Sequence, residues 1–252
     1  DLDSNCRKGW AETSLYTRRC LDICSEKNTS DESMHRKYQN RQCLICYKEL
    51  NQETSLFHLL YPRSLCLDCL SKFEVVSQKT HLLGYSTYVL YKYNDFFRKT
   101  LYQYKALDDY ALKDVFLDSH KYLSKTFKNY CVCSLCSSDA KRMERGFEPV
   151  VDIYATLGVF VHSPFYKKEN VKQSSKSKSE RAHIKDVLAL KDMYPLPKNK
   201  KVLLVDDVCT TGNTLYAAID LIHPDCVFVI AAHPLWIKAN KENIVVKSKG
   251  FW

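Results

Sequence analysis

The stretch KVLLVDDVCTTGNTL, residues 201–215, combines a short apolar run, two adjacent acids and a loop of small residues. The run from Val202 to Val205 is too short for a helix and rich in strand-forming residues, which favours a buried strand of a parallel sheet. From Leu215 to Leu221 the apolar residues follow a helical pattern. A strand, a glycine-containing loop and a helix start form an anion site, because free backbone N–H groups and the helix dipole converge there.

The polar side chains of this stretch divide into two sets. Thr210, Thr211 and Thr214 add hydroxyl donors for a phosphate, whereas Asp206 and Asp207 come at the carboxyl end of the strand, where open α/β sheets place ligands. Carboxylates accept hydrogen bonds, so their natural partner is a diol, with a divalent metal as an option. A ligand with a ribose diol and a 5-phosphate fits both sets. The alternative is an ordinary strand whose acids cap the next helix.

The pattern DD-x-x-TTG-x-T resembles the phosphoribosyl-diphosphate (PRPP) motif of type I phosphoribosyltransferases. The resemblance implies that Asp206 and Asp207 hold the ribose hydroxyls and act in catalysis, that the loop holds the 5-phosphate, and that Mg²⁺ accompanies PRPP. The residues implied to bind PRPP here are Asp206, Asp207, Cys209, Thr210, Thr211, Gly212, Asn213 and Thr214.

A basic turn follows an expected strand over 130–136. The turn contains Ser137 and Ser138 and then three cations, Lys141, Arg142 and Arg145. Cations beside a glycine suit a diphosphate, which rewards forked arginine donors. We therefore predict that the three cations bind the diphosphate of PRPP, and that Ser137 and Ser138 also belong to the PRPP site. The alternative is a solvated charge cluster.

A Ser- and Lys-rich segment, residues 162–185, has the composition of a long loop. Long loops in compact domains are commonly functional lids or disordered. If it is a lid over an anionic ligand, Arg181 is the expected contact; simple disorder is the alternative.

Four cysteines have the spacing of a metal site: Cys43 and Cys46 form one C-x-x-C pair, and Cys66 and Cys69 form a second pair nineteen residues later. Two such knuckles supply four thiolates for tetrahedral Zn²⁺. A closed site of this kind is structural and not catalytic. The surrounding segment is too short for a core of its own, so the metal is expected to decide whether it folds.

Other segments predict the elements around these motifs. We expect helices over 70–83, 94–104 and 111–127, helical spacing over 148–160, and strands over 85–93 and 226–232. Cys131, Cys133 and Cys136 are interpreted as small hydrophobic residues, on the expectation that alternation aims them at different faces. The tyrosines of residues 85–104, with Arg98, Lys99 and Lys105, are either a stacking surface for single-stranded nucleic acid or part of the core.

Size and composition limit the classes of protein. A chain of 252 residues with 45% hydrophobic content is large enough for a full core plus a small module. The net charge of +9 is compatible with nucleic-acid or phosphate ligands. No apolar run approaches the roughly 18 residues that a membrane span needs, and no signal sequence is evident at the N-terminus. Twelve cysteines, four with metal spacing, favour a reducing cytoplasm over a secreted disulfide protein.

The order of the motifs resembles the ComF (ComFC) family of competence proteins over about residues 40–235. It consists of the four cysteines, LYQYKALDDYALKDVF, KRMERGF, SERAH and VLLVDDVCTTGNTL. The resemblance implies an α/β fold, in which a type I phosphoribosyltransferase-like parallel sheet flanked by helices carries an N-terminal four-Cys zinc ribbon. The expected divisions are a disordered or non-native extension over 1–33, the zinc ribbon over 34–80, and the phosphoribosyltransferase-like domain over 81–252.

Two functions follow from this resemblance. The first is an accessory protein of DNA uptake in natural competence and transformation, which binds PRPP or a related ribose phosphate, with single-stranded DNA and a ComFA-like helicase as partners. The second is an active phosphoribosyltransferase that transfers ribose 5-phosphate to a nucleobase or amine. Thr210 occupies the position where purine-salvage enzymes of the hypoxanthine type carry an acid that acts as base, so that base is missing from this chain.

Overall fold

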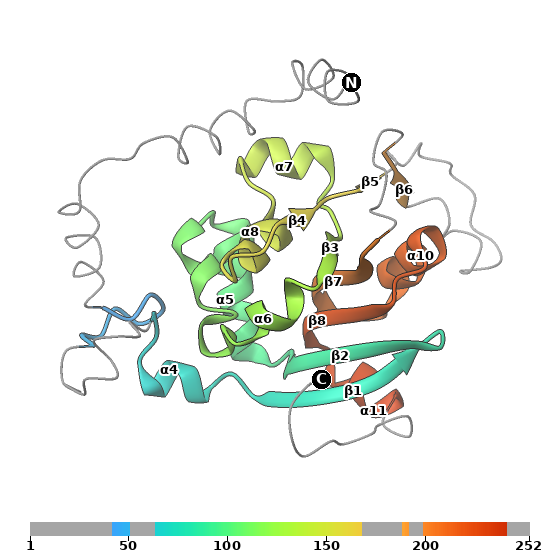
Figure 1. Cartoon of the computed structure of the whole chain (residues 1–252). Coiled ribbons are helices and arrows are strands. Elements are labelled where there is room, and N and C mark those ends of the chain that lie inside the picture. Colours follow the sequence, from blue (N-terminus) through green and yellow to red (C-terminus); the bar gives the residue numbers. More distant parts are fainter. Residues whose placement is uncertain (1–41, 51–63, 168–187, 192–198, 241–252) are drawn as a thin grey trace, which may run out of the picture. The chain divides into compact units, whose positions relative to one another are not determined.

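The computed structural model describes residues 42–50, 64–167, 188–191 and 199–240. Its centre is a six-stranded sheet of order β1-β2-β8-β7-β3-β4, which is parallel except for the antiparallel edge strand β1 (Figure 1). A separate antiparallel pair is formed by β5 and β6. The strands are β1 Val75–Leu82, β2 Tyr85–Lys92, β3 Tyr130–Ser134, β4 Val161–His162, β5 Phe165–Lys167, β6 Leu188–Leu190, β7 Lys201–Cys209 and β8 Cys226–Ala232.

Helices cover both faces of this sheet. They are α4 Leu67–Ser71, α5 Asp95–Ala106, α6 Leu123–Phe127, α7 Asp139–Arg145, α8 Pro149–Ala155, α10 Asn213–Ile222 and α11 Pro234–Ala239, with 3₁₀ turns η1 Tyr110–Asp114 and η2 Asp118–His120. One core cluster joins α5, α6 and α8 to one face, and a second joins α10 and α11 to the other. The mixed α/β fold with a mostly parallel sheet is therefore confirmed.

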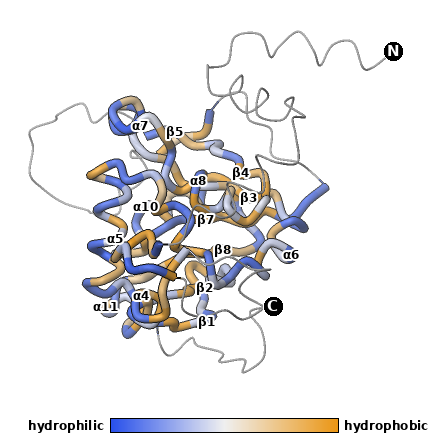
Figure 2. The backbone as a smooth tube through the Cα atoms, turned by 90° about the vertical axis from the view of Figure 1, so that its left-hand side faces the viewer, coloured by the Kyte–Doolittle hydropathy of each residue, from blue (hydrophilic) through white to orange (hydrophobic). Residues whose placement is uncertain are grey.

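The central strands are buried on both sides, as strands of parallel sheets are. All seven residues of β8 are buried, and along β7 Leu203 and Val205 enter one cluster while Leu204 enters the other. Figure 2 shows the hydrophobic segments of β3 and β8 inside the molecule. The predicted strands over 85–93, 130–136 and 226–232 are confirmed.

The helix expected over 70–83 is wrong. Helix α4 ends at Ser71, and β1 pairs with β2 across a two-residue turn in which Leu83 and Gly84 both have positive φ. Positive φ at both central residues is the geometry of a tight hairpin turn that matches the strand twist. In β1 the residues Gln78, Thr80 and Leu82 are buried in alternation. Cross-strand pairing thus overrides the local helical pattern.

The expected helix over 111–127 is replaced by η1, η2 and α6. Val115, Phe116 and Leu117 are consecutive and all buried. A single surface helix cannot bury three consecutive side chains, because successive residues point about 100° apart. The helix over 148–160 is shorter than its pattern suggested, since α8 ends at Ala155 and Gly158 adopts φ +68°.

The helix that begins at Asn94 is confirmed as α5. The Asn94 side chain accepts a hydrogen bond from the Phe97 N–H at 2.9 Å, which satisfies one of the free donors of the first helical turn. Phe97, Leu101 and Tyr104 form the buried side of α5.

The cysteine segment shares the main hydrophobic core. Cys43, Leu65 and Cys69 belong to the same cluster as Phe97 of α5, and the Phe73 ring meets the Phe97 ring at 5.7 Å. The predicted boundary between residues 80 and 81 falls within strand β1. The division into a ribbon over 34–80 and a domain over 81–252 stays a prediction, and the extension over 1–33 lies outside the described residues.

Within the described part of the chain, none of the helices has the length and hydropathy that crossing a membrane requires.

Candidate functional site

Five strands, β2, β8, β7, β3 and β4, run in the same direction, so their carboxyl ends meet at one edge of the sheet. Strand β7 lies between β8 and β3 and extends to Cys209, four residues farther than its apolar run. Asp206 and Asp207 therefore lie within the paired part of β7 and not after the strand. The loop of Thr210, Thr211 and Gly212 leads directly into α10.

The loop has the shape that a phosphate cradle needs. Gly212 precedes α10 with φ +85° and has no side chain, so it provides no side-chain cap, and the start of the helix can accept an anion. Thr210, Thr211 and Asn213 are exposed and Thr214 is half-buried. The Asn213 N–H lies 3.5 Å from the Thr211 hydroxyl oxygen. The Cys209 side chain is buried in the second core cluster, so a ligand at this loop would meet its backbone and not its thiol.

The two acids have different surroundings. Side chains alternate along a strand, so Asp206 and Asp207 leave β7 on opposite faces. The Asp207 side chain is only 7% exposed and forms an ion pair with the Lys105 ammonium of α5. The Asp206 carboxylate accepts the Asp207 N–H at 2.9 Å. Burial and then repulsion by Asp207 raise the pKa of Asp206, while the nearby Lys105 acts in the opposite direction.

The strand is also held from the α8 side. The Tyr154 hydroxyl donates to the Asp206 carbonyl oxygen at 2.8 Å. Tyr154 is buried, and this burial raises its pKa well above the ordinary value, so the hydroxyl stays a donor. The backbone that carries the acids is thus fixed independently of their carboxylates.

The basic turn leaves β3 beside the acids. The Ser137 hydroxyl donates to the Glu148 carboxylate at 2.8 Å, and the Ser137 N–H donates to the same carboxylate at 3.0 and 3.1 Å. Ser138 stands at the start of α7 and its carbonyl accepts the Arg142 N–H at 2.9 Å. Helix α7 carries Lys141 and Arg142 on its exposed surface.

The cations of the basic turn are held differently. Arg142 pairs with Asp139 at 2.8 Å on the surface. Arg145 is largely buried, and its Nε donates to the Lys105 carbonyl oxygen at 2.6 Å and lies 3.8 Å from Asp108. Its Nη1 lies 3.5 Å from the Ser137 hydroxyl oxygen.

Lys105 is the site residue that the sequence did not single out. Its side chain contacts Asp207 and its main chain contacts Arg145, so it connects the acid pair to the basic turn. The sequence pattern was compatible with Lys105 either on a surface for stacking or beside the core. Only its membership of the segment LYQYKALDDYALKDVF, between the cysteines and the basic turn, signalled a role.

The predicted stacking surface is reduced accordingly. Tyr104 is buried and its hydroxyl donates to the Pro149 carbonyl oxygen, so it belongs to the core. Tyr102 is exposed, as are Arg98 and Lys99.

Two further lysines frame the site. Lys167 ends β5 and acts on the Asp206 carboxyl through its charge. Lys191 follows β6 and donates to the Ser163 carbonyl oxygen at 2.8 Å. Arg181, the predicted lid residue, lies outside the described residues.

Cys131, Cys133 and Cys136 are all buried in the second core cluster, which agrees with their interpretation as small hydrophobic residues. The expectation that alternation separates them is wrong for one pair. Cys131 and Cys133 are two residues apart, so they share a face of β3, and their sulfurs lie 3.8 Å apart.

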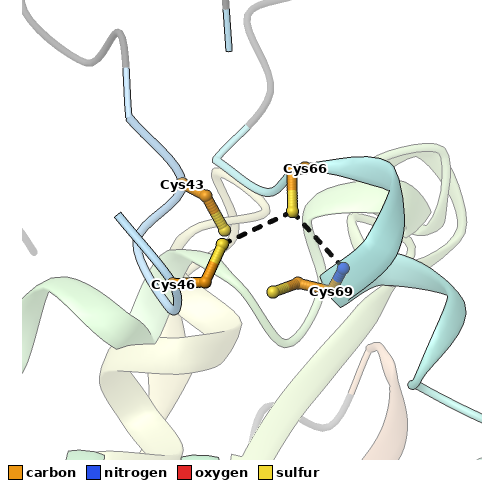
Figure 3. Close-up of side chains that lie close together, drawn as sticks. All are labelled: Cys43, Cys46, Cys66 and Cys69. Atoms are coloured by element: carbon orange, nitrogen blue, oxygen red, sulfur yellow. Dashed lines mark hydrogen bonds between the residues drawn. The ribbon is translucent and has the colours of Figure 1, made fainter. Parts of the chain in front are cut away.

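The four predicted metal ligands come together in a compact cluster (Figure 3). The sulfurs of Cys43, Cys46, Cys66 and Cys69 all lie within 4.8 Å of one another. Four thiolates at about 2.3 Å from one ion would place their sulfurs roughly 3.8 Å apart, so the cluster fits tetrahedral Zn²⁺ with little movement. These residues could hold the ion, which would give the segment a structural cross-link.

Backbone contacts prepare both knuckles for this role. The Cys69 N–H lies 3.4 Å from the Cys66 sulfur, and the Leu44 N–H donates to the Ser64 carbonyl oxygen at 3.0 Å, which ties one knuckle to the other. The Ser64 N–H in turn donates to the Asp118 carboxylate at 3.1 Å. The knuckles are therefore fastened to each other and to η2.

Comparison with known proteins agrees with this architecture. Residues 136–251 match the model of the phosphoribosyl transferase domain family, and this range includes the basic turn and the loop after β7. The chain is 29% identical over 133 residues to competence protein ComFC of Streptococcus pneumoniae, which covers 53% of this chain and 60% of that protein. It is 30% identical over 132 residues to competence protein ComFC of Bacillus subtilis, covering 51% of this chain and 54% of that protein.

The matches thus span between half and two thirds of the length of either relative. The sheet topology, the four-cysteine cluster and the two matched relatives point in one direction: the chain is similar to ComFC competence proteins, and its residues 136–251 match the phosphoribosyl transferase domain family.

Proposed function

We propose that this protein binds PRPP or a related ribose phosphate, together with Mg²⁺, at the carboxyl edge of β7, and that it serves DNA uptake in natural competence as an accessory protein. The observation that carries the ligand assignment is the connection of three parts: the loop before α10, the acids of β7, and the basic turn. Lys105 joins the last two. The competence role is supported by the similarity to the two ComFC proteins.

In this proposal each part meets one portion of the ligand. The N–H groups and hydroxyls of residues 210–214 bind the 5-phosphate, since a helix start favours an anion. Asp206 and Asp207 accept hydrogen bonds from the ribose hydroxyls. Lys141 and Arg142 are exposed and can turn toward a diphosphate, Arg142 by leaving its surface pair with Asp139, while Arg145 stays anchored by its main-chain contact. Arg181 stays a predicted contact for the ligand, and it lies outside the described residues.

The ligand assignment is tested by titration calorimetry with PRPP and Mg²⁺. The double variant Asp206→Ala with Asp207→Ala should lose PRPP binding, because both acceptors for the ribose diol are gone. Asp220→Ala is the matched control, since Asp220 is an exposed acid of α10. Retained binding in the double variant, with the control unchanged, would show that the ligand is held elsewhere.

The second candidate is an active phosphoribosyltransferase. The arrangement that favours it is the connection of the basic turn to Asp207 through Lys105, because these cations would stabilise diphosphate as it leaves ribose C1. The loop position of Thr210 supplies a hydroxyl and no general base. Incubation with PRPP, Mg²⁺ and a panel of nucleobases and amines should release diphosphate if this candidate is correct. Binding of PRPP without release for any acceptor excludes it in favour of the accessory role.

Single-stranded DNA and a ComFA-like helicase are the proposed partners. The net charge of +9 and the exposed residues Arg98, Lys99 and Tyr102 support DNA binding. Phosphate contacts release counterions, so the affinity for single-stranded DNA should fall steeply as salt rises from 50 to 200 mM. A flat salt dependence would count against DNA as a partner. We keep the cytoplasm as the expected compartment, because the nine cysteines of the described segments are all free thiols.

A further inference from the structure

Lys105 lies near the C-terminal end of α5, and its two ends contact two different parts of the site. Its ammonium pairs with Asp207 of β7, and its carbonyl oxygen accepts the Arg145 Nε of α7 at 2.6 Å. The Lys105 side chain is 29% exposed, so the ammonium borders solvent, while the Asp207 side chain is almost fully covered. A ligand that reaches Asp207 must therefore meet Lys105.

Arg145, whose side chain contacts the Lys105 main chain, is less suited to respond to a ligand. The Arg145 guanidinium is engaged by the Lys105 carbonyl, by Asp108 and by the Ser137 hydroxyl. These contacts give Arg145 a structural role in the basic turn. By contrast, the Lys105 ammonium is a compact charge on a flexible stem with three donors, and one carboxylate cannot use all three.

We propose that Lys105 is a binding residue for the diphosphate of PRPP. With Asp207 occupied by the ribose diol, the Lys105 ammonium lies between the ribose and the basic turn and donates to a diphosphate oxygen. The ion pair with Asp207 keeps this cation in place before the ligand arrives, and it keeps the buried carboxylate paired. This assignment rests on the proposed function, because it deepens the role of the same site.

A Lys105 that binds the diphosphate should contribute to the affinity for one of two related ligands and not to that for the other. PRPP and ribose 5-phosphate share the ribose and the 5-phosphate and differ by the diphosphate on C1. A charge-assisted hydrogen bond to the diphosphate contributes only to PRPP, whereas a purely structural role of Lys105 would affect both ligands alike.

The test is titration calorimetry of the full chain with PRPP and Mg²⁺ and, separately, with ribose 5-phosphate. Lys105→Met should lower the affinity for PRPP by about 10-fold or more, the size expected for a charge-assisted hydrogen bond. It should lower the affinity for ribose 5-phosphate by less than about threefold. Lys105→Arg keeps the charge and should recover most of the PRPP affinity. Lys125→Met removes an exposed cation of α6 and should leave both affinities unchanged.

Equal weakening of both ligands by Lys105→Met, or unchanged PRPP affinity, overturns the assignment and leaves the proposed function intact. Wild-type protein that binds neither ligand overturns the proposed function and this assignment together.

A second measurement avoids the need for a variant that folds. Acetic anhydride modifies accessible lysine amines, and mass spectrometry reports the extent at each lysine. In the wild-type protein, PRPP with Mg²⁺ should protect Lys105 more than ribose 5-phosphate does, with Lys99 as the internal reference. Equal protection by the two ligands contradicts the assignment.

Discussion

Gly212 shows at the scale of one residue how the backbone shapes the loop after β7. Its φ of +85° lies in the left-handed region, where a Cβ costs about 1–2 kcal/mol. A Cβ would also lie 3.2 Å from the Tyr216 ring and 3.3 Å from Trp236 Nε1. Glycine is therefore required for two separate reasons, conformation and space.

Gly212→Ala should destabilise the protein by about 2 kcal/mol and weaken PRPP binding, because the loop must shift away from both rings. Gly84→Ala is the control: Gly84 also has positive φ, yet nothing lies within 4 Å of its added Cβ, and it sits in the β1–β2 turn. Chemical denaturation and calorimetry measure the two effects. An alanine at 212 that behaves like the alanine at 84 would contradict the close packing as a cause.

Asp206 should make the stability of the folded protein depend on pH. Burial and the charge of Asp207 raise its pKa, so the folded protein keeps a proton that the unfolded chain releases above about pH 4. The unfolded state then binds fewer protons than the folded state, and stability falls as the pH rises above 4 toward the raised pKa. The charged groups that act on this carboxyl from neighbouring positions are Asp207, Lys105 and Lys167.

Asp206→Asn cannot ionise and should escape this loss. We expect the variant to exceed the wild type in unfolding free energy by about 1–3 kcal/mol at pH 8, and by much less at pH 5. Denaturation with urea at the two pH values measures the difference, and Asp220→Asn is the exposed control. A constant difference across pH would show that the gain does not come from ionisation.

At the scale of elements, Glu148 couples the segment after β3 to the start of α8. Its carboxylate is buried and accepts the N–H and the hydroxyl of Ser137. This contact sets the direction in which the chain leaves β3 for the basic turn. Without it, the Ser137 N–H would lose a buried acceptor.

Glu148→Ala should cost about 1–3 kcal/mol of stability, because a largely buried donor is left unsatisfied. It should also weaken PRPP binding, since Ser137 positions the Arg145 side chain. Glu144→Ala, an exposed acid of α7, should change neither quantity. Unfolding free energies and calorimetric affinities give the comparison; full PRPP affinity in Glu148→Ala would argue that the turn holds its shape without this contact.

At the scale of the whole molecule, the cysteine cluster is continuous with the domain core. The Phe73 ring, four residues after Cys69, meets the rings of Phe96 and Phe97 at 5.2 and 5.7 Å. These two aromatics belong to α5, the helix that ends at Lys105 and Ala106. Packing thus links the four-cysteine cluster to the helix that contacts the acids.

Removal of bound metal should therefore lower the stability of the domain core as well as that of the two cysteine knuckles. We expect about one Zn²⁺ per chain by elemental analysis, and a chelator should lower the melting temperature, because bound metal contributes folding free energy. Cys69→Ser should have the same effect. Cys226 is a buried thiol of β8 outside the cluster, so the Cys226→Ser variant should still bind a full complement of zinc. A melting temperature that is insensitive to chelation would show that the core alone holds the segment.

The sequence by itself determined the central strand, the loop and the helix after it, because a buried parallel strand and a glycine turn leave strong local patterns in KVLLVDDVCTTGNTL. It also determined the four-cysteine cluster, since ligand spacing specifies a metal knuckle without reference to the rest of the chain. The hairpin of β1 and β2 was decided only by tertiary pairing, because local preference there favoured a helix. Lys105 was likewise decided by the fold: its contacts with Asp207 and Arg145 join residues 40 to 102 positions apart, a separation that no local pattern can encode.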